Sequence, residues 1–193
     1  MKKVVLAIVA ILVLILAISG CGYNGLVKLD EDVKTKWAQV ETQYQRRSDL
    51  IPNLVSTVKG AAKFEQGTLT QVIEARSKAS QITIDPDKLT EENMQKYQAA
   101  QGQLSQALGK LMVLTENYPE LKATQQFSEL SAQLEGTENR ITVARKDFNE
   151  SVQTYNVKVR SFPNNLTAGI FGFSQKAAFK ADAGAQNAPK VEF

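Results

Sequence analysis

Two groups of charged and amide side chains are the residues of this chain whose types could support binding chemistry. They lie at positions 46–53 and 138–140, and their members are Arg46, Arg47, Asp49, Asn53, Glu138, Asn139 and Arg140. Arginine forks bind carboxylate and phosphate groups, so the pattern is typical of a surface for a protein partner, a lipid head group or a wall polymer. The alternative is structural, because the same side chains could cap broken helices and form internal ion pairs.

The composition argues against an enzyme. The chain has no histidine and one cysteine, which removes the commonest general base, the usual zinc ligand and any internal disulfide. A Ser-Lys dyad or a carboxylate site stays formally possible, but helical bundles typically build di-metal sites with Glu-x-x-His pairs. We therefore expect no catalytic residues, no cofactor and no metal. The net charge of +3 comes with no basic stripe interleaved with aromatic residues, so we expect no nucleic-acid partner.

The N-terminus has the form of an export signal. Lys2 and Lys3 precede an apolar run over residues 4–18, and small residues follow it at positions 19 and 20. A short basic region, an apolar region and small residues before a cleavage site are the three parts of such a signal. The signal predicts that the chain from residue 23 onward lies outside the cytoplasm.

Cys21 allows two interpretations of this signal. An aliphatic residue, two small residues and a cysteine resemble the lipobox of bacterial lipoproteins, in which the cysteine is acylated and becomes the new N-terminus. Cys21 would then be the lipidation site, and Gly22 in place of aspartate would permit sorting to the outer membrane. The alternative is an uncleaved signal anchor, although the run is shorter than the ~20 residues of a full membrane span. Both interpretations attach the protein to a membrane.

The rest of the chain is patterned for helices. Apolar residues recur at steps of three or four, which is the period of an amphipathic helix. Such stripes cover residues 30–45, 54–79, 90–114 and 120–162. The last of these helices would be about 60 Å long and cannot be stable without partners of similar length.

Proline and glycine predict where these helices bend. Pro52 should break or sharply kink the chain within residues 46–53, because proline removes a helical hydrogen bond and clashes with the preceding turn. Gly67 and Gly136 predict further bends. Thr90 is the expected N-cap of the third helix.

The predicted fold is therefore all-α, an antiparallel up-down four-helix bundle with kinked long helices, preceded by an N-terminal apolar signal or anchor segment. The expected divisions are a signal sequence with lipobox or an anchor at residues 1–20, the bundle at 23–162, and a phenylalanine-containing, partly disordered tail at 163–193. The bulky core anchors should be Trp37, Phe127, Phe148 and Tyr155.

The tail has two interpretations. In the first, it folds back onto the bundle and ends in a disordered stretch. In the second, it is a docking segment, since the terminal Val191-Glu192-Phe193 has the form that domains capture when they add a peptide strand to a sheet edge.

Several motifs of the exported part resemble, in the same order, those of the LemA family of bacterial proteins. They are Tyr23-Asn24, Leu26-Val27, Lys36-Trp37-Ala38-Gln39-Val40-Glu41, Gln45-Arg46-Arg47-Ser48-Asp49-Leu50-Ile51-Pro52-Asn53-Leu54-Val55, Glu74-Ala75-Arg76, Leu134-Glu135-Gly136-Thr137-Glu138-Asn139-Arg140-Ile141, Tyr155-Asn156, Phe162-Pro163 and Phe171-Gly172-Phe173. The resemblance implies a membrane-tethered, extracytoplasmic helical bundle with no established enzymatic activity. Many family members keep an uncleaved N-terminal span, and their genes often lie beside genes for membrane phosphatase-like proteins or membrane zinc proteases. It therefore implies a membrane or envelope protein partner.

Three functions are compatible with the sequence. The first is a non-enzymatic cell-envelope lipoprotein that serves as a scaffold or adaptor for a membrane or envelope protein. The alternative is a sensor or binding protein for an anionic envelope ligand, which requires a pocket lined by Arg46 or Arg47. The third is a purely structural spacer.

Overall fold

The computed structural model describes residues 2–60 and 66–180, and for residues 4–21 it describes the backbone alone. Every regular element in these residues is helical, which confirms the all-α class. In chain order the elements are α1 (Lys2–Lys59), α2 (Gln66–Gln81), the short 3-10 helix η1 (Pro86–Lys88), α3 (Glu91–Thr115), α4 (Pro119–Lys122), α5 (Gln125–Arg160) and α6 (Asn164–Phe171).

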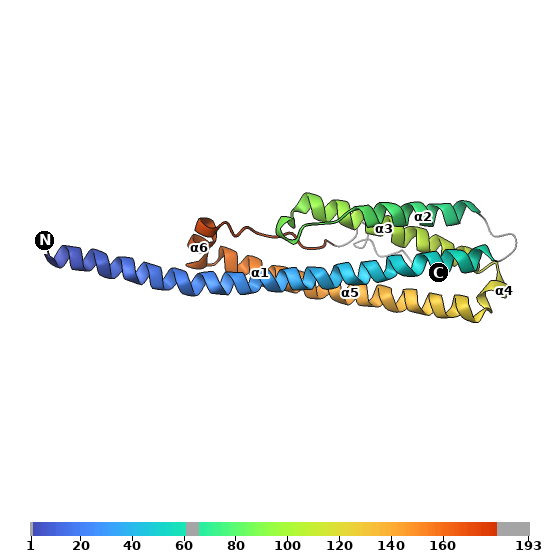
Figure 1. Ribbon diagram of the computed structural model, residues 1–193, viewed down its shortest axis with the longest axis horizontal. Coiled ribbons are helices and arrows are strands. Elements are labelled where there is room, and N and C mark those ends of the chain that lie inside the picture. Colours follow the sequence, from blue (N-terminus) through green and yellow to red (C-terminus); the bar gives the residue numbers. More distant parts are fainter. Residues whose placement is uncertain (1, 61–65, 181–193) are drawn as a thin grey trace, which may run out of the picture.

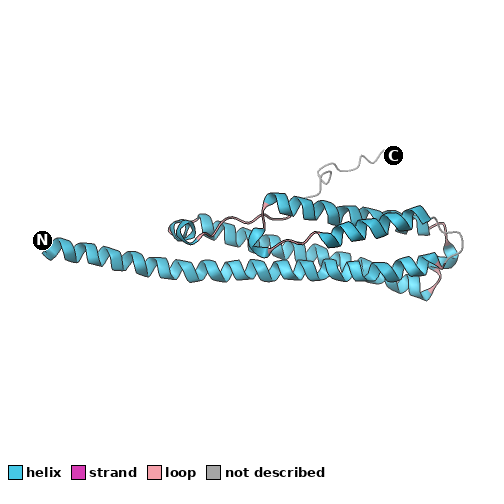
Figure 2. Ribbon diagram, turned by 45° about the horizontal axis from the view of Figure 1, so that its top comes forward, coloured by secondary structure: helices cyan, strands magenta, loops and turns pink. Residues whose placement is uncertain are grey.

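The helices form an elongated body. α1 and α5 lie side by side over most of the body's length, and α2 and α3 form a second pair beside them (Figures 1 and 2). Each successive long helix runs opposite to the one before it, and the N-terminal part of α1 extends beyond the other helices (Figure 1). No helix in the described part of the chain is long and apolar enough to cross a membrane.

The predicted break at residues 46–53 is wrong, because α1 continues through Pro52 to Lys59. Pro52 has no N–H, so the carbonyl of Ser48 loses its helical donor. The Nε of Arg76, on α2, donates a hydrogen bond to that carbonyl at 2.8 Å. The helix is therefore kept whole by a side chain from its neighbour, and the defect becomes a contact between α1 and α2.

Other helix boundaries also differ from the expectation. The predicted helix 54–79 is divided, because α1 ends at Lys59 and α2 begins at Gln66, just before Gly67. The predicted helix 120–162 is divided as well, between α4 and α5, where Thr124 accepts a hydrogen bond from the N–H of Phe127 at 3.4 Å. α5 is one uninterrupted helix across Gly136. The cap at Thr90 is confirmed, since its hydroxyl accepts from the N–H of Asn93 at 3.3 Å.

Two apolar clusters form the core. One surrounds Trp37 and Phe148 at the end of the body nearer α6, and the other surrounds Leu54 and Leu111 at the far end. The four predicted core anchors are all buried. Burial of each large apolar side chain contributes ~1.5–3 kcal/mol. The two clusters meet α1 on either side of residues 45–49, so polar side chains separate them there.

Arg76→Ala should lower the free energy of unfolding by about 1 kcal/mol, because the carbonyl of the buried Ser48 then has no donor. In a Pro52→Ala background the same change should cost almost nothing, since the N–H of alanine can donate to that carbonyl. Urea denaturation of the two single variants and the double variant measures the coupling. Equal costs of Arg76→Ala in both backgrounds would contradict this explanation of the unbroken helix.

Candidate functional site

Arg47 lies at the centre of a polar layer between the two apolar clusters. Its side chain is 2% exposed, and Nη1 donates to Oγ of Ser105 at 2.6 Å and to Oε2 of Glu138 at 2.9 Å. Nη2 donates to Oε1 of Gln101 at 2.7 Å and to its carbonyl at 3.3 Å. The guanidinium also lies 5.0 Å from the ring centroid of Tyr44. We use the name polar layer for Arg47, Gln101, Ser105 and Glu138.

The polar layer joins three helices. Arg47 comes from α1, Gln101 and Ser105 come from α3, and Glu138 comes from α5. Both terminal nitrogens of the guanidinium are engaged inside the protein, and its charge is balanced by Glu138. The structure therefore places Arg47 in an internal ion pair rather than in a pocket for an external anion.

The other sequence-predicted site residues lie on the outside of α1 and α5. Arg46, Asn53 and Asn139 are exposed. Asp49 is also exposed and accepts a hydrogen bond from Gln45 at 2.8 Å. Arg140 is exposed as well, and donates to the hydroxyl of Thr137 at 3.2 Å. Of the seven residues, the structure joins only Arg47 and Glu138 by a described contact, and a partner surface formed by the rest stays a prediction.

A second polar arrangement holds residues 173–180, which we call the tail segment. The chain leaves α6 at Gly172, whose φ of +78° favours glycine, and folds back along α3 and α5. Asn156 makes a pair of hydrogen bonds with the backbone of Lys176, at 2.9 Å to N–H and 2.8 Å to the carbonyl. Asn149 makes the same pair with the backbone of Phe179, at 2.9 and 3.1 Å.

Gln98 and Leu89 extend this backbone recognition to the α3 side. Gln98 makes a third amide pair with the backbone of Lys180, at 3.4 and 2.8 Å. The N–H of Ala177 donates to the carbonyl of Leu89 at 2.8 Å. The tail segment is thus bound by its main chain from both sides of a cleft.

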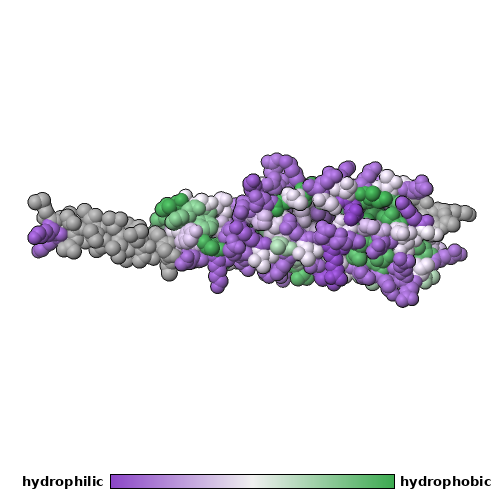
Figure 3. Space-filling model, viewed as in Figure 1, coloured by the Kyte–Doolittle hydropathy of each residue, from purple (hydrophilic) through white to green (hydrophobic). Residues whose placement is uncertain are grey.

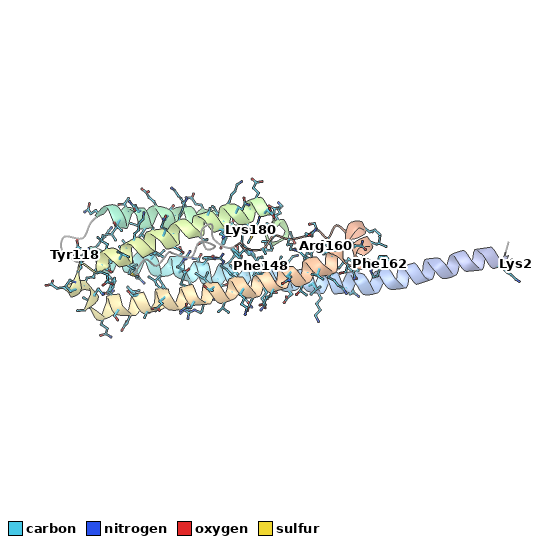
Figure 4. The ribbon with its side chains drawn as sticks, turned by 180° about the vertical axis from the view of Figure 1, so that it is seen from behind. Lys2, Tyr118, Phe148, Arg160, Phe162 and Lys180 are labelled. Carbon is cyan, nitrogen blue, oxygen red and sulfur yellow. The ribbon has the colours of Figure 1, made fainter. Side chains whose placement is uncertain are left out.

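Phe179 fixes the tail segment in the core. Its ring centroid lies 6.0 Å from that of Trp37 in a stacked arrangement and 5.6 Å from that of Phe148 edge-on. The guanidinium of Arg145 lies 4.6 Å above the same ring. Figure 4 labels Phe148 on α5. It also labels Lys180, the residue after Phe179, on the side of the body towards α3.

Lys176 provides an electrostatic contact for the tail segment. Its Nζ lies 2.8 Å from Asp30 and donates to the carbonyl of Pro86 at 3.1 Å. Asp30 also contacts Lys34 at 3.1 Å, and Lys34 contacts Asp87 at 2.9 Å. These contacts with Asp87 and Asp30 raise the pKa of Lys34, and the contact with Lys34 lowers the pKa of Asp87. α1, η1 and the tail segment are therefore joined by one chain of alternating charges.

The cleft continues past the end of the tail segment. Beyond Lys180 it has a volume of about 680 Å³, and its lining includes Gln98, Gln101, Ser105, Glu138 and Arg145. It therefore reaches the polar layer. The sequence pattern does not predict this cleft, although Asn149 and Asn156 are seven residues apart and so lie on one face of a helix.

Exposed apolar side chains gather at α6, at the end of the body from which α1 extends. Phe162 and Ile170 are 80% and 76% exposed, and Leu166 and Phe171 are exposed as well. We call these four residues the apolar foot. Figure 3 shows them as an apolar patch at this end, and Figure 4 labels Phe162 there. Tyr23 of α1 contacts the ring of Phe171, with centroids 4.8 Å apart.

α6 is closely packed on α1. A Cβ added at Gly22 would lie 3.0 Å from Oδ1 of Asn164 and 3.3 Å from Oγ1 of Thr167, so only glycine allows this approach without a shift. The apolar foot is thereby held beside residue 22, four residues after the apolar run at 4–18 ends.

Arg47→Ala should lower the free energy of unfolding by about 2–4 kcal/mol, because it leaves a void and deprives Gln101 and Ser105 of their partner. Glu138 is half exposed and can regain water. Arg46→Ala is the matched control: it removes the same side chain one position earlier, where it is exposed, and should change stability by no more than about 0.5 kcal/mol. Equal effects in chemical denaturation would show that the polar layer carries no stability.

Comparison with known proteins gives a consistent result. A family model described as the LemA family matches residues 36–193. Magnetosome proteins MamQ 1 and MamQ 2 of Paramagnetospirillum magneticum (strain AMB-1) are each 27% identical over 175 residues, covering 82% of this chain and 64% of the relative. Protein LemA of Metamycoplasma hominis is 23% identical over 158 residues, covering 82% of this chain and 68% of the relative. The chain thus spans just under two thirds of the length of the MamQ relatives.

Proposed function

Since the chain belongs to the LemA family, we propose that it is a non-enzymatic, membrane-tethered protein of the cell envelope that binds a membrane or envelope protein. In this proposal the four long helices act as one antiparallel bundle outside the cytoplasm. The N-terminal segment tethers it, through a lipid on Cys21 after removal of residues 1–20, or else as an uncleaved signal anchor. The lipid form would also permit outer-membrane sorting.

The apolar foot is the observation that carries the membrane part of the proposal. It lies beside Gly22, at the point where an apolar N-terminal run would leave a bilayer. Phenylalanine and tyrosine rings are suited to the membrane–water interface, and exposed aliphatic side chains gain free energy when they enter it. Lys28 on α1 and Arg160 on α5 are both exposed. Their positive charges suit the anionic head groups of a membrane surface.

The protein-partner role is favoured over the binding of an anionic ligand. The anionic-ligand alternative needs a pocket lined by Arg46 or Arg47. Arg47 is buried and paired with Glu138, and Arg46 is exposed on the outside of α1. The cleft between α3 and α5 instead binds polypeptide main chain, as the tail segment demonstrates in cis. The proposal that the protein is not an enzyme rests on the residue types in its sequence.

The depth of the apolar foot can be measured with a fluorophore. The full-length chain, with Cys21→Ser or with Cys21 acylated, would carry Ile170→Cys labelled with a nitrobenzoxadiazole dye and be reconstituted into vesicles containing doxyl-labelled phospholipid. Position 170 should be strongly quenched. Val143→Cys is the matched control, because Val143 is an exposed aliphatic residue on α5 away from α6. Equal quenching at both positions would overturn the membrane-facing orientation.

The form of the tether has a separate test. Intact mass spectrometry of the protein purified from its native membrane should find a chain that begins at acylated Cys21. Detection of an intact Met1 would instead establish the uncleaved anchor and exclude lipidation as the tether.

A further inference from the structure

We propose that the cleft between α3 and α5 is a binding groove for an extended peptide of a partner protein, and that the tail segment is its internal ligand. The partner segment would carry a phenylalanine preceded by a lysine three positions earlier. This inference rests on the proposed partner-binding function and names the chemical class of the partner.

The cleft recognises the main chain of the tail segment. Asn156, Asn149 and Gln98 each use both atoms of a side-chain amide to bond the N–H and the carbonyl of a single residue. Such pairs read the backbone of an extended chain and are indifferent to its side chains. A groove that holds exchangeable peptides requires such a sequence-independent grip on the main chain.

The spacing of two amide side chains along α5 matches the spacing of their backbone partners along the tail segment. Asn149 and Asn156 are seven helical residues apart, which corresponds to about 10.5 Å along α5. Their backbone partners, Phe179 and Lys176, are three residues apart, which corresponds to about 10 Å of extended chain. The distance between the two amides along α5 is therefore nearly the same as the distance between their backbone partners along the tail segment.

The cleft also contacts two specific side chains of the tail segment. The aromatic pocket formed by Trp37, Phe148 and Arg145 accepts a phenylalanine. Asp30 pairs with a lysine three residues before that phenylalanine, since the Nζ of Lys176 lies 2.8 Å from its carboxylate. Together the two sites define a lysine and a phenylalanine at fixed spacing as the side chains that the groove selects.

The described side chains that line the cleft extend beyond those that contact the tail segment. The cleft continues for about 680 Å³ beyond Lys180 along α3 and α5. A longer peptide would use the same amides and the additional surface.

The test uses the full chain and a fluorescein-labelled peptide with the sequence of residues 173–180. Ala177→Pro removes the N–H that bonds Leu89 and should release the tail segment while leaving the groove residues unchanged. Phe179→Ala is a second released variant. Trp37, the only tryptophan, reports release because it stacks on Phe179. In fluorescence anisotropy the peptide should bind either released variant at least tenfold more tightly than the wild-type chain, in which the tail segment competes.

Two controls define the site. Asn149→Ala in the Ala177→Pro chain should weaken peptide binding at least tenfold, and a peptide with alanine in place of its final phenylalanine should not bind. Absence of saturable binding to both released variants, or binding that Asn149→Ala leaves unchanged, would overturn the proposal.

A wild-type dimer that Ala177→Pro converts to a monomer in sedimentation would place a second copy in the groove and overturn the foreign partner. Failure here leaves the quenching of position 170 unaffected, so the two proposals fail separately.

Discussion

The structure depends on the burial of one guanidinium. A charge withdrawn from water at Arg47 is tolerated only because Gln101, Ser105 and Glu138 supply acceptors from two other helices. A slip of α1 by one turn would withdraw the guanidinium from these partners, so the buried fork favours one register of the three helices. The polar layer thereby fixes how α1, α3 and α5 align, and it forms one end of the cleft between α3 and α5.

The same logic explains the length of α1. Pro52 leaves the carbonyl of Ser48 without a helical donor. Arg76 donates to that carbonyl and so joins α2 to α1. In both places a polar group that would be unsatisfied within its own helix is satisfied by a side chain of another helix, and the contact positions the two helices. The glutamine and asparagine side chains of the cleft extend this to the tail segment, whose main chain has no helix or sheet of its own to satisfy it.

The sequence predicted the features that depend on local pattern. The three-to-four periodicity predicted helices, and the cap at Thr90 is where the pattern placed it. The break at Pro52 was predicted wrongly because the compensating donor, Arg76, comes from another helix. The division at Thr124 was missed because the apolar stripe continues on both sides of it.

The candidate site was predictable only in part. Arg47 and Glu138 were identified by residue type, but they are 91 positions apart, and nothing local indicates that they pair inside the core. The amide side chains that bind the tail segment were not predicted. Asparagine is common on helix surfaces, and its role here depends on the extended chain that lies beside it. The apolar foot likewise depends on where α6 packs, and the tail's apolar residues alone do not determine that.

The claim that the polar layer sets the register of the helices has a direct measurement. Double electron–electron resonance between spin labels at Lys96→Cys on α3 and Lys146→Cys on α5, both exposed positions, reports their alignment in a Cys21→Ser chain. The account predicts one narrow distance distribution with Arg47 present, and a distribution broadened or displaced by about one helical turn, roughly 5 Å, with Arg47→Leu. An unchanged narrow distribution in a folded Arg47→Leu chain would contradict it.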